Sequence, residues 1–193
     1  MPIQIPADIT VVTLRSGSTT HPQRFTLEYA QSILQQASDL IQARADIVFR
    51  LGNSEEATVE MPEGMRGDVV DTSGFHFLVA SFRAGNGVKV ICVDRIAQQE
   101  IGGRSREEKR VCILPYNQDA GSTARKLAHE LGHLLGLGHI DEGWQPGPGR
   151  EAERAAMIRN LMFSGALTPD ALLTETQISQ ARSSALASRF AAA

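Results

Sequence analysis

The sequence predicts a mixed α/β (α+β) fold in which helices back a twisted, mixed β-sheet. Three observations indicate it: β-branched apolar runs typical of strands, apolar stripes with helical spacing, and a strand–helix–strand order near the amino terminus. The chain has 193 residues, of which 42% are hydrophobic and 21% are charged. These values are ordinary for a soluble globular protein of one domain, so we expect residues 1–193 to form a single domain.

The first predicted unit is a right-handed crossover. Residues 9–14 and residues 47–51 are rich in β-branched and apolar side chains and are interpreted as strands. Between them, apolar residues recur at helical spacing and predict an amphipathic helix over residues 27–43. A strand, a long helix and a strand in this order are typical of a βαβ unit.

The middle of the chain supplies the rest of the sheet. Residues 72–84 fit either a helix or a strand, and a helix is favoured, while residues 88–94 and 111–116 are interpreted as strands. Pro115 lacks an N–H group, which favours an edge position for the strand at 111–116. The charged run Arg104–Arg110 is interpreted as a solvated loop in preference to a specificity element.

A last helix is predicted near the carboxyl terminus. Thr174 and Gln177 have the spacing of a capping box, which marks a helix amino terminus. The residues expected on its buried stripe are Ile178, Ala181, Ala185 and Leu186.

Charge and hydropathy exclude several classes of partner. The net charge of −3 gives no electrostatic reason for binding nucleic acid, and no apolar run is long enough for a membrane span, so neither partner is expected. The amino-terminal residues lack the features of a signal peptide, which fits either a cytosolic protein or a mature fragment of a secreted one. Cys92 and Cys112 lie in apolar runs and are interpreted as buried thiols, with a cross-strand disulfide as the alternative.

The most specific pattern is residues 129–139, which read H-E-x-x-H-x-x-G-x-x-H. His129 and His133 are four residues apart, so on a helix both imidazoles face the same side and can hold one metal ion. Gly136 can end that helix because glycine adopts positive φ at little cost, which lets the chain bring His139 back to the same ion. Three histidines leave a fourth tetrahedral position for water, as in catalytic zinc sites.

This string resembles the signature of the metzincin clan of zinc peptidases, in which a turn containing a methionine follows downstream. Residues Asn160-Leu161-Met162 resemble that turn, most closely the turn of matrixin-like members, so the resemblance implies that Met162 lies beneath the metal. Met157 is a nearby competitor. The resemblance covers about residues 122–164, and it departs from the family pattern at Ile140 and Ser164, where other members carry family-marking residues or an additional tyrosine ligand.

The resemblance implies a zinc-dependent endopeptidase in which one zinc ion is bound by His129, His133 and His139. Glu130 would then act as the general base towards water. It further implies a catalytic cleft between an amino-terminal part, residues 1–138, and a carboxyl-terminal part, residues 139–193. A peptide or protein substrate would add as a strand along the edge at 111–116. We expect a monomer. The alternatives are an inactive zinc-binding module that recognises peptides, which the intact Glu130 disfavours, and a purely structural zinc site.

Overall fold

The predicted crossover forms in the structure, a computed structural model that describes residues 1–97, 103–165 and 167–191. Strand β1 (Ile3–Ser16) leads through helix α1 (Leu27–Ala45) into strand β3 (Ile47–Glu60), and β3 pairs parallel with β1. Both strands are much longer than their apolar segments because they continue as a paired ribbon whose outer residues, 51–60, are mostly exposed. The parallel βαβ arrangement is thereby confirmed.

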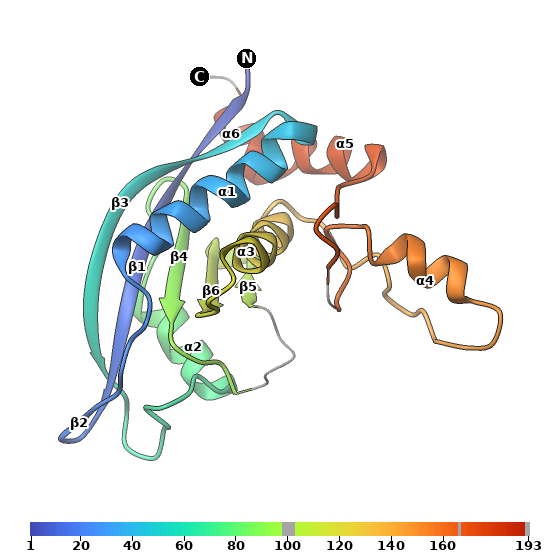
Figure 1. Cartoon of the computed structure of the whole chain (residues 1–193). Helices are drawn as coiled ribbons and strands as arrows, with labels where there is room; N and C mark the ends of the chain where they lie inside the picture. Colours follow the sequence, from blue (N-terminus) through green and yellow to red (C-terminus); the bar gives the residue numbers. More distant parts are fainter. Residues whose placement is uncertain (98–102, 166, 192–193) are drawn as a thin grey trace.

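In the described residues the sheet is mixed and has five strands in line, with a sixth at one end of β1. Its order runs β3, β1, β4, β6, β5, and only β5 and the short β2 pair antiparallel to their neighbours (Figure 1). The strands not yet given are β2 (Thr19–Thr20), β4 (Val88–Val93), β5 (Arg104–Arg106) and β6 (Val111–Pro115).

The edge strand differs from the prediction. Strand β6 lies between β4 and β5, so the segment at 111–116 is not an edge. Pro115 is accommodated because it is the last residue of β6, and the next N–H, that of Tyr116, donates to Val93 O at 2.9 Å. The outer strand is β5, which belongs to the charged run interpreted from sequence as a solvated loop. That interpretation is wrong for residues 104–106, whose backbone pairs with β6 although their side chains are polar.

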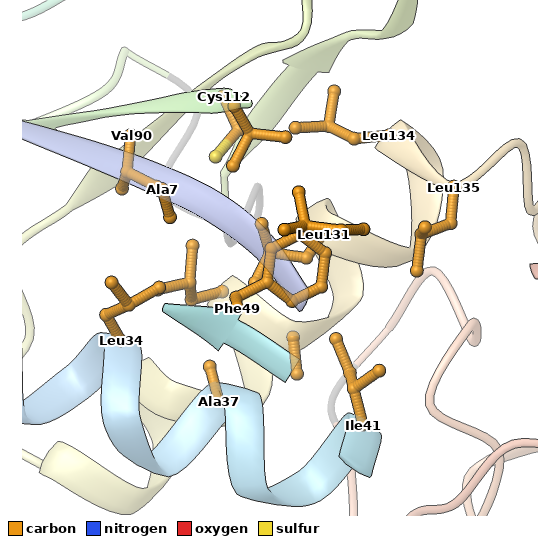
Figure 2. Close-up of a cluster of buried hydrophobic side chains, with 14 of the residues drawn as sticks. Ala7, Leu34, Ala37, Ile41, Phe49, Val90, Cys112, Leu131, Leu134 and Leu135 are labelled. Carbon is orange, nitrogen blue, oxygen red and sulfur yellow. The ribbon is translucent and has the colours of Figure 1, made fainter. Parts of the chain in front are cut away.

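Helices cover both faces of the sheet. Residues that alternate along β1, β4 and β6 enter two separate apolar clusters, as the two-residue period of a strand requires. One cluster packs under helix α2 (Thr72–Ser81), which confirms the helical interpretation of residues 72–84. The larger cluster packs under α1 and helix α3 (Ala120–Leu134), and Figure 2 shows a part of it, including Ala7, Phe49, Cys112 and Leu131. Cys92 and Cys112 are buried free thiols.

The carboxyl-terminal part joins the same core. Helix α4 (Glu151–Met157) follows a segment rich in proline and glycine, residues 141–149, and α5 (Glu175–Ser183) begins with the predicted capping box of Thr174 and Gln177. The single tail helix of the prediction is two helices, because the extended Ser184 ends α5 and caps α6 (Ala185–Phe190). Helices α5 and α6 pack against α1 and β1 (Figure 1). Among the helices of the described residues, none is long and apolar enough to span a membrane.

Candidate metal centre

Helix α3 carries the first two histidines and ends before the third, and the chain turns between the end of the helix and His139. Asp119 caps its amino terminus, and apolar residues such as Leu127 and Leu131 bury one side against the sheet. The helix ends at Leu134, and Gly136 has a φ of 78°, a conformation that glycine adopts without strain. Gln180 of α5 donates to Gly136 O at 2.6 Å, so α5 braces this turn.

The three histidines bring their Nε2 atoms together. His129 and His133 Nε2 are 3.0 Å apart, His133 and His139 Nε2 are 3.1 Å apart, and His129 and His139 Nε2 are 3.2 Å apart. Three nitrogens that bind one tetrahedral zinc at its usual Zn–N distance lie about 3.3 Å from one another. The spacing of the three nitrogens therefore fits one metal ion of this size.

The hydrogen bonds of the other ring nitrogens point to the same conclusion. His129 Nδ1 lies 2.8 Å from Leu161 O, and His133 Nδ1 lies 2.8 Å from Leu137 O. A carbonyl oxygen only accepts, so each Nδ1 carries the proton, and in a neutral ring each Nε2 then presents a lone pair. Burial lowers the pKa of His129 to about 4 and also lowers the pKa of His133, which keeps both rings neutral. Converging lone pairs repel one another unless a cation lies between them, so this donor set fits zinc.

Met162 lies in a tight turn packed against α3. The turn is residues 160–163, called here the methionine turn, and Phe163 N donates to Asn160 O across it. Met162 is fully buried, and a Cβ atom on Gly132 would lie only 2.5 Å from its sulfur. The same turn supplies Leu161 O to His129, so it positions a candidate metal ligand directly.

Two further contacts hold the methionine turn to the segment after the third histidine. Ile140 N donates to Met162 O at 3.0 Å, and the Ser164 hydroxyl donates to Asp141 at 2.5 Å. Sequence reasoning missed Asp141, and only the Ser164 departure from the family pattern pointed to this region. The pair joins the segment just after His139 to the residue that follows the methionine turn.

Glu130 lies beside the histidines in a nearly buried position. Its side chain is only 5% exposed, and burial raises the pKa of the carboxyl to about 7, while a hydrogen bond from Ser105 opposes that rise. A Cβ atom on Gly103 would lie 2.7 Å from Glu130 Cγ. Gly103, just before β5, and Ser105, within it, were not foreseen from sequence because their contact with Glu130 is not local.

A cleft of about 1240 Å³ runs past these residues. It is lined from the amino-terminal part by β5 and α3 and from the carboxyl-terminal part by residues that follow Met162. The lining includes all three histidines and Glu130, with Phe163, Ser164, Gly165 and Leu167 on the opposite side. The predicted metal ligands and the predicted base therefore share one open site that an extended chain can enter beside an edge strand.

Compared by sequence, the chain matches neither a protein-family model nor a curated protein. Compared by structure, it resembles solved zinc peptidases over nearly their whole lengths. Mature mirolysin from Tannerella forsythia, solved with a cleaved peptide, superposes with a TM-score of 0.68 at 14% identity, covering 98% of this chain and 96% of that chain.

Two archaeal structures have the same fold. Archaemetzincin from Methanopyrus kandleri gives a TM-score of 0.58 at 12% identity over 93% of this chain and 94% of that chain. A zinc-dependent peptidase from Methanocorpusculum labreanum gives 0.54 at 11% identity over 91% and 99%. The metzincin-like fold predicted from the motif is thus confirmed. The matrixin-like subgroup stays a prediction, since none of these three proteins is described as a matrixin.

Proposed function

We propose that this chain is a zinc-dependent endopeptidase that hydrolyses peptide bonds with Glu130 as its general base. The observation that carries the proposal is the convergence of three histidine nitrogens beside a buried carboxyl in an open cleft. The metzincin-like fold supports it, because the solved structures that share this fold include an archaemetzincin, a zinc-dependent peptidase and a mirolysin in complex with a cleaved peptide.

Each residue has a distinct role in the proposed reaction. His129, His133 and His139 would hold the zinc ion, which supplies electrostatic polarisation of the scissile carbonyl and acidifies water. Glu130 accepts a proton from the attacking water and later donates it to the leaving amine. Its pKa of about 7 reflects burial without a nearby cation, and a cation bound by the adjacent histidines would lower it and favour the basic carboxylate.

The substrate would be a peptide or protein that pairs with β5. In the described residues, β5 is the outer strand of the sheet on the cleft side, and its free edge offers backbone groups for strand addition. We propose further that residues 1–138 and 139–193 act as one catalytic domain, because both parts line the cleft and share the core under α1 and α3. The monomeric state stays a prediction.

Zinc content and turnover together test the proposal. We expect one zinc per chain by elemental analysis and cleavage of a denatured protein that stops with a chelator. His133→Ala should lose both zinc and activity, whereas Glu130→Gln should keep zinc and lose roughly 100-fold or more in rate. His76→Ala is the matched control, because His76 is exposed on α2 and should change neither.

Two outcomes would contradict the proposal. Zinc-free native protein, or full turnover by Glu130→Gln, would refute the proposed mechanism. Zinc and peptide binding without chelator-sensitive turnover would instead identify the inactive recognition module.

A further inference from the structure

Two basic side chains lie in the cleft next to the reactive groups. Arg125 and Lys126 line it from α3, four residues before His129 and Glu130 respectively. Residues four apart on a helix stack on one face at a rise of about 6 Å. The two cations therefore lie about one helical turn from the metal centre, along the same wall of the cleft.

These two cations have no acidic partner in the part of the chain that the structure describes. All the ion pairs found there involve other residues. The neighbouring arginines of β5 differ, since Arg106 pairs with Glu108 at 2.8 Å and Arg104 lies over the Phe75 ring. Arg125 and Lys126 are half-buried, so each has lost part of its hydration without gaining a counterion. A ligand carboxylate would supply that counterion.

The acidic groups of the cleft are placed differently. Apart from Glu130, the acidic residue in the described lining is Glu107, whose Oε1 would lie 3.5 Å from a Cβ atom on Gly136. Lys126 lies eight residues before Leu134, where α3 ends just ahead of Gly136, which is about 12 Å along the helix. An extended peptide spans that distance with about four residues, at about 3.3 Å each. A Cβ atom on Gly103 would meet Glu130 and one on Gly136 would meet Glu107, so the segment containing β5 runs alongside α3. The charge of the cleft is therefore polarised along β5 and α3, with the basic end over the amino-terminal half of α3.

We propose that the cleft selects peptides with an acidic side chain within about two residues of the scissile bond. This side chain lies on the side of the bond that faces the amino-terminal half of α3, where Arg125 and Lys126 bind it. This inference rests on the proposed peptidase function. The reach follows from the one-turn offset between these two residues and the metal centre, which equals about two residues of extended chain. A basic side chain at the same position would be repelled by Arg125 and Lys126. At the other end of the cleft, Glu107 favours a basic side chain.

Matched peptides test the preference. The peptides are capped at both ends, so the side chain is the only carboxylate, and they carry Glu, Gln or Lys at one position flanking the cleavage site. We expect kcat/KM to be about tenfold higher for the Glu peptide than for the Gln peptide, the factor that a charge-assisted hydrogen bond contributes. The ratio should fall as salt is raised. A second arm with free carboxyl termini tests whether the terminal carboxylate gives the same effect; a preference found only in that arm would overturn the side-chain assignment.

Variants assign the preference to these residues. In Arg125→Gln/Lys126→Gln the ratio of the Glu to the Gln peptide should fall to about one, while zinc content and thermal unfolding show that the variant is folded. Lys109→Gln removes an exposed positive charge outside the cleft lining and should leave the ratio unchanged. An unchanged ratio in the double variant would overturn the proposal.

Binding separates this inference from the proposed function. Fluorescence anisotropy with labelled peptides measures affinity for Glu130→Gln, in which turnover is not needed. Equal affinity and equal cleavage of Glu and Gln peptides would overturn the charge preference and leave the peptidase function standing. Tighter binding of the Glu peptide that depends on Arg125 and Lys126, without any turnover by the native protein, would support the charge preference and reject the peptidase function.

Discussion

Replacing Gly132 by alanine would probe the contact between α3 and the methionine turn. The added Cβ would lie 2.5 Å from Met162 Sδ and 3.2 Å from its Cε. Met162 is fully buried, so its side chain has no solvent into which it can move. Overpacking of this kind costs about 1–3 kcal/mol, whereas alanine gains up to about 1 kcal/mol over glycine in a helix. The net expectation is destabilisation of about 1 kcal/mol.

Denaturant unfolding of the zinc-free protein measures this free energy, and zinc affinity is measured in parallel. Gly121→Ala is the control in the same helix, because its Cβ would meet neighbours no closer than 3.4 Å and should be neutral or stabilising. In the Gly132→Ala variant, zinc affinity should also fall, since the methionine turn that is pushed away supplies Leu161 O to His129.

The sign of the change decides the question. If Gly132→Ala stabilises the protein by about 1 kcal/mol, as at an open helical position, the close contact with Met162 is wrong. A double-mutant cycle with Met162→Ala sharpens the test. Removing the methionine opens space for the new methyl group, so the two changes together should cost less than the sum of the single changes, with a coupling of about 0.5–3 kcal/mol.

Two other substitutions address Glu130. Gly103→Ala should lower turnover while zinc content stays at one per chain, because the new Cβ would lie 2.7 Å from Glu130 Cγ and displace the base; normal activity would contradict this contact. Glu130→Gln should change the pH dependence of unfolding in the zinc-free protein. Burial raises the Glu130 pKa from 4.5 to about 7, so the wild type should lose about 3 kcal/mol between these pH values as the buried carboxyl ionises, a loss that the variant lacks. Parallel pH profiles for the two proteins would refute it.

The candidate metal centre could be proposed from sequence because most of its residues lie close together along the chain. His129, Glu130 and His133 occupy one helix, and their relative positions follow from helical geometry alone. Gly136 predicts the turn that brings His139 back towards the other two histidines, and in the structure it has the positive φ that this turn needs. Only Met162 lies further along the chain, and its placement depended on a resemblance in place of a spacing rule.

The sheet edge was not predictable, because strand pairing depends on the partner. The outer strand β5 has three polar residues and shows no alternation, so its sequence favours a loop. Its backbone is ordered by hydrogen bonds to β6, which the sequence of residues 104–106 does not encode. The edge position predicted from Pro115 was wrong for a related reason. A proline disfavours a central strand only where its missing N–H would be needed, and the end of β6 needs no N–H there.

The proposed catalytic residues can therefore be identified from a local motif, whereas the proposed substrate-binding groups come together only when the chain folds. His129, Glu130 and His133 lie on one helix and His139 follows five residues after its end, so a motif suffices to identify them. The groups that would recognise a substrate are the backbone of β5 and the charges on Arg125 and Lys126, and they form one surface only after β5 has paired beside α3. Under the proposed function, a chain that keeps the motif, Gly103 and Ser105 while changing the other residues of β5 or the first turns of α3 would keep the reaction and alter the peptides it accepts. Substitutions at those positions of the two segments should therefore change the charge preference and leave zinc affinity unchanged.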